Sequence, residues 1–313
     1  MTLHAIPANP VPEGASAGEI KTADGVQLRY ARWNPAAPRR GTVCVFIGRG
    51  DMIEKYFEVV EELRRRGFAV TVLDWRGQGG SQRRLKDPRK GYVKSFDEYQ
   101  LDLETLIRDV VLPDCPPPLF ALGHSMGGLI LLEAVKQGRR WFDRIVLTSP
   151  MLHFAGARGE WFAPYAANVA RLFGLGRLYI PGDGPAPISQ RPFHDNRATS
   201  DPVRYERTAS IVESMPDLAV GSATIGWAHA AFKVMRRVNE PTYPAEIRQP
   251  LMILAAGKDA IVSNAAIERF ATRLRAGSHL VVSGSRHEIL MERDVFRSQF
   301  WAAFDAFVPG SAR

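Results

Sequence analysis

The fold of this 313-residue chain is most constrained by a regular alternation of short apolar runs with amphipathic helical patterns. Buried or half-buried strands are predicted at 27–33, 42–47, 68–73, 118–122, 144–147, 251–255 and 279–282. Helical stripes lie between and after them, at 56–63, 99–110, 128–136, 267–274 and 296–307. Strands that alternate with helices predict an α/β fold with a mostly parallel central sheet and helices on both faces. The strand at 27–33 alternates in polarity and is expected to be an antiparallel edge strand.

The alternation stops between 150 and 249. Helix-like amphipathic pieces in this stretch are separated by Pro- and Gly-rich breaks, such as 181–187, and no strand pattern is present. We therefore predict a core made of residues 1–149 and 250–313, with 150–249 inserted as a helical cap. No internal repeat is visible.

Residues 123–127 have the sequence Gly-His-Ser-Met-Gly and lie between a predicted strand and a predicted helix. In a G-x-S-x-G turn of this kind, the serine is held in strained backbone geometry and its hydroxyl is exposed at the end of the strand. The two glycines leave room where strand and helix approach. Ser125 is therefore the candidate nucleophile.

A serine hydroxyl needs a base to remove its proton, and the base needs an acid to orient it. Asp259 directly follows the strand at 251–255, and His287 follows the strand at 279–282, so the chain order is Ser, Asp, His. Asp143 precedes its strand and is the weaker candidate for the acid. His124 adjoins the serine and is expected to shape the substrate pocket.

Acyl transfer also needs N–H donors for the oxyanion of the tetrahedral intermediate. One is the backbone N–H of Met126, directly after the nucleophile. We assign the other to the backbone N–H of Arg49, in the Gly-rich loop 48–51 that follows the strand at 42–47. The loop at 74–81, with sequence DWRGQGGS, is expected to have a structural role. No metal-ligand spacing or phosphate-binding glycine loop is present, so we predict no metal and no cofactor.

The net charge of +8 and the two cysteines constrain the partners and the cellular compartment that we expect for the protein. The basic residues fit either an ordinary solvated surface or peripheral contact with an anionic membrane, and no nucleic-acid-binding signature accompanies them. Cys44 and Cys115 give no disulfide framework, and the N-terminus has no secretory signal pattern. We predict a cytoplasmic protein, with contact at the inner face of the membrane as a candidate, and nothing indicates an obligate protein partner.

These motifs resemble those of the monoacylglycerol lipase and lysophospholipase branch of the α/β-hydrolases. The resemblance rests on GHSMGG, on the DxRGxGxS loop at 74–81, on Asp259 and on the RHEILME segment around His287. The segment 48–81 is similar to bacterial lysophospholipases. Many relatives have His-Gly before the oxyanion donor where this chain has Ile47-Gly48, a departure shared by the bacterial lysophospholipase subgroup. The resemblance implies an α/β-hydrolase fold with a helical cap over the serine.

The expected function is hydrolysis of single-chain acyl lipids, either lysophospholipids or monoacylglycerols. The same triad serves small-molecule carboxylesterases, aminopeptidases and acyltransferases, and a non-hydrolytic ligand receptor on this scaffold is a further alternative. Aromatic side chains of the cap could line a tunnel for the acyl chain or pack within the cap: Trp161, Phe162, Tyr165 and Phe173. Arginines of the cap could bind a lipid phosphate: Arg191, Arg197 and Arg204.

Overall fold

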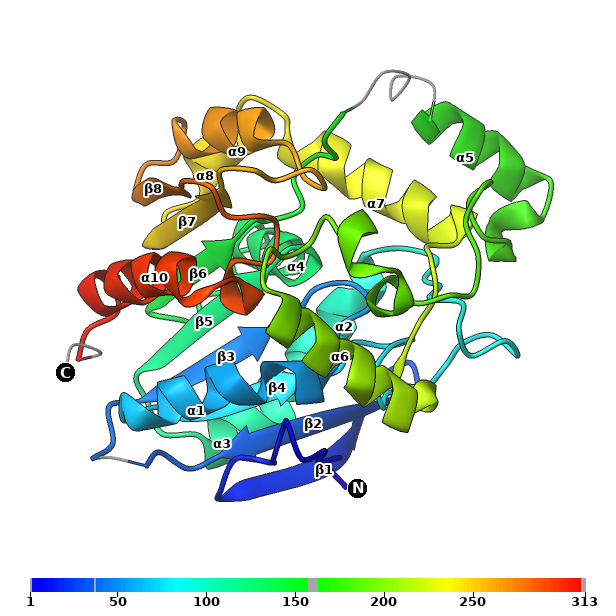
Figure 1. Cartoon of the computed structure of the whole chain (residues 1–313). Coiled ribbons are helices and arrows are strands. Elements are labelled where there is room, and N and C mark those ends of the chain that lie inside the picture. Colours follow the sequence, from blue (N-terminus) through cyan, green and yellow to red (C-terminus); the bar gives the residue numbers. More distant parts are fainter. Residues whose placement is uncertain (1, 37, 157–162, 311–313) are drawn as a thin grey trace.

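The computed structural model describes residues 2–36, 38–156 and 163–310, and its centre is an eight-stranded sheet (Figure 1). The strand order is β1-β2-β4-β3-β5-β6-β7-β8. β2 is antiparallel to both of its neighbours, β1 and β4, and all pairs from β4 to β8 are parallel. The strands are β1 (Ala15–Lys21), β2 (Gln27–Trp33), β3 (Thr42–Phe46), β4 (Ala69–Leu73), β5 (Leu119–His124), β6 (Arg144–Thr148), β7 (Leu251–Ala256) and β8 (Gly277–Val282).

The prediction that the strand at 27–33 lies at the edge of the sheet is wrong. β2 pairs with β4 on one side and with β1 on the other, so β1 is the edge strand. β1 consists largely of small and polar residues that remain partly exposed, and it therefore lacks the apolar alternation that would identify a strand in the sequence.

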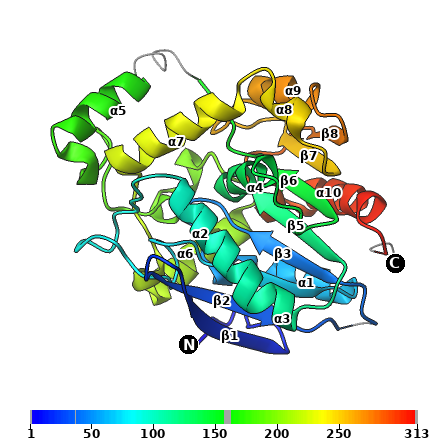
Figure 2. The same ribbon diagram turned by 180° about the vertical axis from the view of Figure 1, so that it is seen from behind.

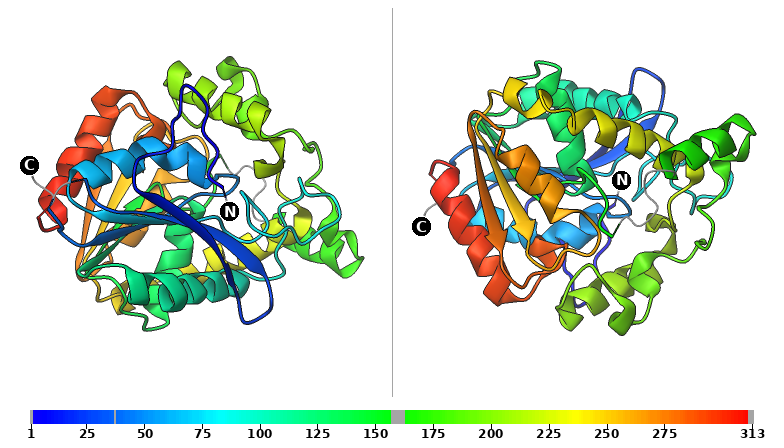
Figure 3. Two further views of the ribbon diagram at one scale, coloured as in Figure 1. Left: turned by 90° about the horizontal axis from the view of Figure 1, so that it is seen from below. Right: turned by 90° about the horizontal axis from the view of Figure 1, so that it is seen from above.

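Helices cover both faces of the sheet, as the three ribbon views show (Figures 1, 2 and 3). The helices α1 and α10 lie on one face, and α2 and α4 lie on the other. The core helices are α1 (Phe57–Arg65), α2 (Asp97–Leu106), α3 (Leu112–Asp114), α4 (Met126–Lys136), α9 (Asn264–Ala271) and α10 (Asp294–Phe307). Because they lie between two helical layers, β3, β4, β5 and β7 are buried along their whole length.

Every regular element in the described part of 150–249 is helical. These elements are α5 (Ala163–Leu172), α6 (Pro202–Ser214), α7 (Ile225–Val238) and α8 (Tyr243–Glu246), together with the turns η3 (Leu175–Arg177), η4 (Ile188–Gln190), η5 (Phe193–Asp195) and η6 (Pro216–Leu218). Among the described residues outside this stretch, η1 (Ile53–Tyr56) and η7 (Ile289–Met291) are short 3-10 turns, and η2 (Ile107–Val111) is a π-helical segment between α2 and α3. No helix among the described residues is both long and apolar enough to cross a membrane.

The inserted helices contact the core to different extents. Trp227 and Val234 of α7 and Tyr243 of α8 belong to the same hydrophobic cluster as the sheet residues. The helix α6 instead contributes Ile211 and Val212 to a separate small cluster. The helix α5 packs on α7 and η3 and projects away from the sheet (Figures 1 and 3). The insertion is therefore anchored through α7 and α8 and is progressively less buried toward α5.

Candidate active site

Ser125 lies on a tight turn between β5 and α4, with the backbone strain that the sequence predicts. Its φ of 49° lies in the left-handed region, which is costly for a residue with a side chain, by about 1–3 kcal/mol. The flanking residues Gly123 and Gly127 must be glycines because a side chain at either position would clash with neighbouring atoms. A Cβ on Gly127 would lie 2.2 Å from the carbonyl oxygen of Phe46, and one on Gly123 would lie 2.7 Å from Leu131 Cδ1. The turn is held by the Ser125 N–H, which donates to the Thr148 carbonyl oxygen at 3.0 Å.

The three predicted catalytic side chains form a continuous hydrogen-bonded chain. His287 Nε2 lies 3.0 Å from Ser125 Oγ, and His287 Nδ1 lies 2.7 Å from Asp259 Oδ2. Ser125 and Asp259 follow β5 and β7, and His287 lies on the loop after β8. Because parallel strands end at the same edge of a sheet, the fold brings together residues that are 162 positions apart in the chain.

Asp259 is held in its ionised form. Burial alone would raise the pKa of this carboxyl, but the hydrogen bond to His287 and the charge of its imidazolium form lower the pKa below its ordinary value. Oδ1 also accepts hydrogen bonds from the backbone N–H groups of Ile261 and Val262, at 2.8 and 2.9 Å. An ionised Asp259 can accept a hydrogen bond from the Nδ1–H of His287, which leaves Nε2 free to receive the proton of Ser125.

His124 lies beside the triad and lines the cavity, as predicted, but it is not suited to act as the base. Burial, followed by the repulsion of a protonated His287, lowers the pKa of His124 to about 3. Its ring centre lies 4.9 Å from that of His287, and its Nδ1 lies 3.1 Å from Thr148 Oγ1. His124 is therefore not the base, whereas His287 lies within hydrogen-bonding distance of Ser125 Oγ.

The loop 48–51 contains the Arg49 N–H, which we predict to be an oxyanion donor. The Gly48 N–H donates to Asp51 Oδ2 at 2.9 Å, and the Gly50 N–H donates to Gln78 Oε1 at 3.1 Å. Among the described residues, neither the Arg49 N–H nor the Met126 N–H has a hydrogen-bond acceptor. A Cβ on Gly48 would lie 3.5 Å from Ser125 Cβ, so this loop adjoins the nucleophile. The two free donors are available for the oxyanion of an acyl substrate.

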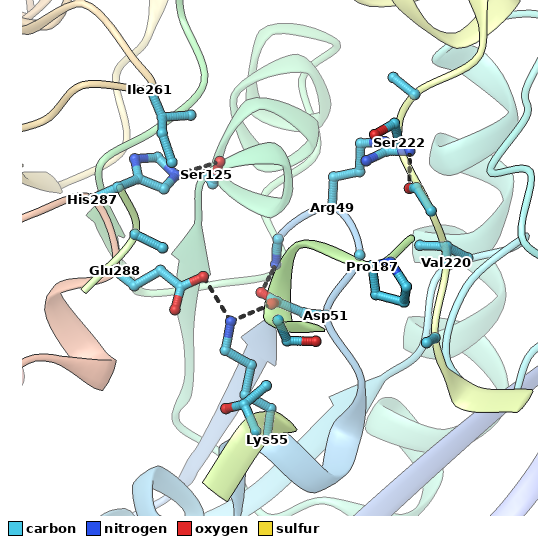
Figure 4. Close-up of a pocket in the computed structure, with 18 of the residues that line it drawn as sticks. Arg49, Asp51, Lys55, Ser125, Pro187, Val220, Ser222, Ile261, His287 and Glu288 are labelled. Atoms are coloured by element: carbon cyan, nitrogen blue, oxygen red, sulfur yellow. Dashed lines mark hydrogen bonds and ion pairs between the residues drawn. The ribbon is translucent and has the colours of Figure 1, made fainter. Parts of the chain in front are cut away.

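A buried charged cluster supports this loop, and the sequence analysis missed it. Lys55 Nζ donates to Asp51 Oδ1 at 2.6 Å and to Glu288 Oε1 at 2.7 Å (Figure 4). Asp51 Oδ2 also accepts a hydrogen bond from Tyr56 Oη at 2.9 Å. Although burial opposes both charges, Asp51 and Lys55 stabilise each other, so the pKa of Asp51 is lowered and that of Lys55 is raised. The cluster joins the oxyanion loop to the residue after His287.

The loop at 74–81 supports the oxyanion loop from the other side. Gln78 Nε2 donates to the carbonyl oxygens of Gly48 and Asp51, at 2.8 and 3.3 Å. Trp75 Nε1 donates to the carbonyl oxygen of Ile47 at 2.9 Å. These contacts agree with the structural role expected for the motif.

A cavity of about 470 Å³ opens above Ser125 and His287. Its volume lies within the usual range for small-molecule sites. Core loops and the insertion both contribute to its walls, and apolar side chains are prominent among them: Met151, Phe154, Val212, Trp227, Phe232 and Ile261. The site can therefore bind an apolar substrate group beside an activated serine.

The aromatic residues predicted to line an acyl tunnel are not among the residues around this cavity. Tyr165 and Phe173 have exposed fractions of 72% and 78%. The helix α5 packs on α7, and these two side chains remain directed to solvent. Trp161 and Phe162 lie outside the described residues. The prediction fails for Tyr165 and Phe173 because an apolar stripe does not indicate which neighbour it faces.

The cap arginines proposed for phosphate binding also lie elsewhere or are engaged. Arg204 contacts the carboxylates of Glu58, Asp201 and Asp294. Arg191 lines the cavity but faces Asp183 at 3.3 Å, and Arg197 is exposed and lies outside the cavity lining. Within the described residues, no group of three or more His, Cys, Asp or Glu side chains could hold a metal ion.

The fold and the site together define the α/β-hydrolase class. The solved structure of a soluble variant of monoglyceride lipase from Saccharomyces cerevisiae, in complex with a substrate analogue, has a TM-score of 0.74 and 20% sequence identity, covering 95% of this chain and 97% of that one. The predicted α/β-hydrolase fold is therefore confirmed.

The family model described as serine aminopeptidase, S33 matches residues 37–294, and the chain belongs to this family. Lysophospholipase L2 of Escherichia coli is 30% identical over 291 residues, which is 90% of this chain and 83% of that protein. A monoacylglycerol lipase of Mycolicibacterium smegmatis is 25% identical over 271 residues, or 86% of this chain and 88% of that protein. The resemblance to the monoacylglycerol lipase and lysophospholipase branch is confirmed.

Proposed function

We propose that this protein is a serine ester hydrolase that cleaves single-chain acyl lipids, lysophospholipids or monoacylglycerols. The observation that carries the proposal is the Ser125–His287–Asp259 chain at the base of a largely apolar cavity. Relatives named lysophospholipase and monoacylglycerol lipase, matched over most of their length, support the same substrate class.

In the proposed reaction, Ser125 Oγ attacks the ester carbonyl carbon while its proton passes to His287 Nε2. The N–H groups of Arg49 and Met126 stabilise the oxyanion, and Asp259 orients His287. His287 then gives the proton to the leaving alcohol, and an acyl-enzyme remains. A water molecule, activated by His287, releases the fatty acid and restores Ser125.

The test is hydrolysis of 1-oleoylglycerol and of a 1-oleoyl lysophospholipid by the wild type and by Ser125→Ala. Removal of the nucleophile should lower kcat by about 10⁴-fold or more on whichever lipid is cleaved. The matched control is Ser298→Ala, an exposed serine of α10 whose hydroxyl bonds only the Val295 carbonyl oxygen among the described residues. Cleavage of short esters alone would favour a small-molecule carboxylesterase, and stoichiometric lipid binding without turnover would favour a receptor.

The proposal includes two features of the insertion. Residues 150–249 act as the cap, with α7 and α8 as the part that is fixed to the core. Its outer part contacts an anionic lipid surface, because apolar side chains lie exposed on α5 and the residues after it: Tyr165, Leu172, Phe173, Leu175 and Leu178. Arg171 and Arg177 lie in the same segment and would add attraction to anionic lipids.

A further inference from the structure

Among the described residues that line the cavity, Arg49 is a cation that forms no ion pair with a carboxylate. Arg49 Nη2 donates to the carbonyl oxygen of Gly221 at 3.0 Å, and its guanidinium lies 5.0 Å from the ring centre of Trp227. Its Nε is buried and has no hydrogen-bond partner. Within the part of the chain that the structure describes, no carboxylate forms an ion pair with it. Burial lowers the pKa of Arg49, and the charge of Asp183, which lies beyond ion-pair distance, offsets this effect only in part. An arginine keeps its proton in a protein, so the cavity retains a positive charge.

The other cations around the cavity differ from Arg49 in this respect. Each faces at least one carboxylate: Lys55 faces Asp51 and Glu288, Arg204 faces Glu58 and Asp201, and Arg191 faces Asp183. A half-buried charge that forms no ion pair is unfavourable, and a ligand anion would reduce that penalty. Arg49 is therefore the candidate for binding an anion of the substrate.

The position of Arg49 relative to the nucleophile fits one class of substrate. Its backbone N–H is the proposed oxyanion donor beside Ser125, and its side chain extends away from the Ser125–His287 pair toward Ser222 (Figure 4). About six bonds separate the backbone nitrogen of an arginine from its guanidinium carbon. About six bonds also separate the ester carbonyl carbon from the phosphorus of a 1-acyl lysophospholipid.

We propose that the Arg49 guanidinium binds the phosphate of a lysophospholipid, so that this residue contacts both ends of the substrate's glycerol unit. The planar guanidinium can donate two parallel hydrogen bonds to phosphate oxygens. This inference rests on the proposed function and narrows it, because a monoacylglycerol lacks the phosphate. Arg49 then determines head-group preference, while the triad performs the same chemistry on either lipid.

The test compares 1-oleoyl lysophosphatidic acid with 1-oleoylglycerol, which differ only in the phosphate, in the same neutral detergent micelles. The measured quantity is the ratio of the two kcat/KM values. Arg49→Met keeps the backbone N–H, and we expect it to lower the ratio by about 10- to 100-fold, the range for a charged hydrogen bond. Arg49→Lys keeps the positive charge but not the planar pair of N–H donors, so it should give an intermediate ratio. Arg197→Met is the matched control and should leave the ratio unchanged.

An equal loss on both lipids, together with a lower thermal midpoint, would mean that Arg49 only holds the Gly221 segment in place, and the inference would be wrong. If Arg49→Met fails to fold, the intermediate ratio of Arg49→Lys carries the test. If Arg49→Lys then has the same ratio of kcat/KM values as the wild type, the inference is contradicted.

A binding measurement separates this inference from the proposed function. Calorimetry on Ser125→Ala and on Ser125→Ala with Arg49→Met would use the ether analogues of the two lipids, which cannot be hydrolysed. Selective loss of affinity for the phosphorylated ether supports the role of Arg49 even if the wild type hydrolyses neither ester, in which case the proposed function alone fails. An affinity that does not depend on Arg49 overturns the inference. Inorganic phosphate that binds as tightly as the ether lipid would identify a free-phosphate site instead.

Discussion

The core side and the cap side of the cavity are held in place by different means. On the core side, Ser125, Asp259 and His287 follow parallel strands, and hydrogen bonds link them to one another. On the cap side, α6 is attached through Arg204 and Arg207, which both contact Glu58 of α1. The outer helix α5 packs on α7 and η3 and leaves apolar side chains in solvent.

This difference means that the residues proposed for the chemical step and the residues that contact the substrate are held in place by different parts of the molecule. The side chains of the proposed triad extend from loops at the carboxyl ends of parallel strands. The chemical step therefore depends on the two hydrogen-bond distances that link Ser125, His287 and Asp259. Ion pairs and a small apolar cluster hold α6 on the core, whereas α7 and α8 pack into the main hydrophobic cluster. Contacts of the first kind tolerate other residues and other arrangements. Changes on the two sides should therefore be distinguishable in what they alter and by how much.

The largest effect should come from Asp259→Asn on the core side. The amide cannot hold His287 in the tautomer that leaves Nε2 free, so kcat should fall by about 10³- to 10⁴-fold. The measurement is the steady-state rate on a soluble short ester, with circular dichroism to verify folding. Asp143→Asn, at the exposed aspartate that was the weaker candidate, is the control and should retain the wild-type rate. Comparable losses in both variants would contradict the assignment of the acid.

A smaller effect, on stability, should follow from Glu58→Gln where the cap meets the core. The change removes the carboxylate shared by Arg204, Arg207 and Arg297, of which Arg297 is only 4% exposed. The side chain of Glu58 is 25% exposed, so we expect a loss of about 2–3 kcal/mol in the free energy of unfolding, below the range for fully buried pairs. Urea unfolding measures this loss. Glu61→Gln, at a carboxylate of the same helix that pairs with Arg64 and Arg65, should cost less than about 1 kcal/mol.

The loss caused by Glu58→Gln should also depend on pH. Burial alone would raise the pKa of Glu58, but the surrounding arginines lower it from 4.5 to about 2. A carboxyl with a lowered pKa in the folded state adds stability above its unfolded pKa and loses that contribution as the pH falls through the folded pKa. The difference between wild type and Glu58→Gln should therefore be full at pH 7 and should shrink between about pH 4.5 and pH 2. A difference that stays constant over this range would contradict the ion-pair explanation.

The smallest effect should come from Leu172→Ser with Phe173→Ser at the exposed end of α5. We expect roughly 1 kcal/mol per side chain in membrane partitioning, below the value for full burial, with no change in the rate on a soluble ester. Sedimentation with anionic lipid vesicles measures the partitioning. The control is Leu112→Ser, at an exposed leucine of α3 outside the insertion. If both variants partition like the wild type, α5 is not the contact surface.

The parts of the molecule that could be predicted from sequence are those set by strong local patterns. The strand at 27–33 was predicted from its alternating polarity and six others from apolar runs, all to within a few residues. Apolar runs identify strands of this kind because buried parallel strands are continuously apolar. The proposed triad rests on the position of Ser125 after one strand and of Asp259 and His287 after two later ones, and the structure places the three side chains within hydrogen-bonding distance. The strand β1 was missed, because an exposed edge strand of small and polar residues has no such pattern.

The remaining features depend on contacts between distant segments. The spacing of Asp51 and Lys55 is a signal for an ion pair, but many surface helices have the same spacing, and Glu288 is 233 residues away from Lys55. The lack of an acidic partner for Arg49 is a property of the folded cavity. The direction in which Tyr165 and Phe173 point depends on how α5 packs on α7.

The hydrogen bonds of Gln78 have a consequence for any transfer of this site to another protein. Its side-chain amide donates to the carbonyl oxygens of Gly48 and Asp51 and accepts from the Gly50 N–H. The shape of the segment 48–51 is thus set in part from outside the segment. A graft of these residues alone onto a related scaffold would carry the peptide but not its conformation. The smallest transferable unit is the pair of loops 48–51 and 74–81, because hydrogen bonds from the second loop help to set the conformation of the first.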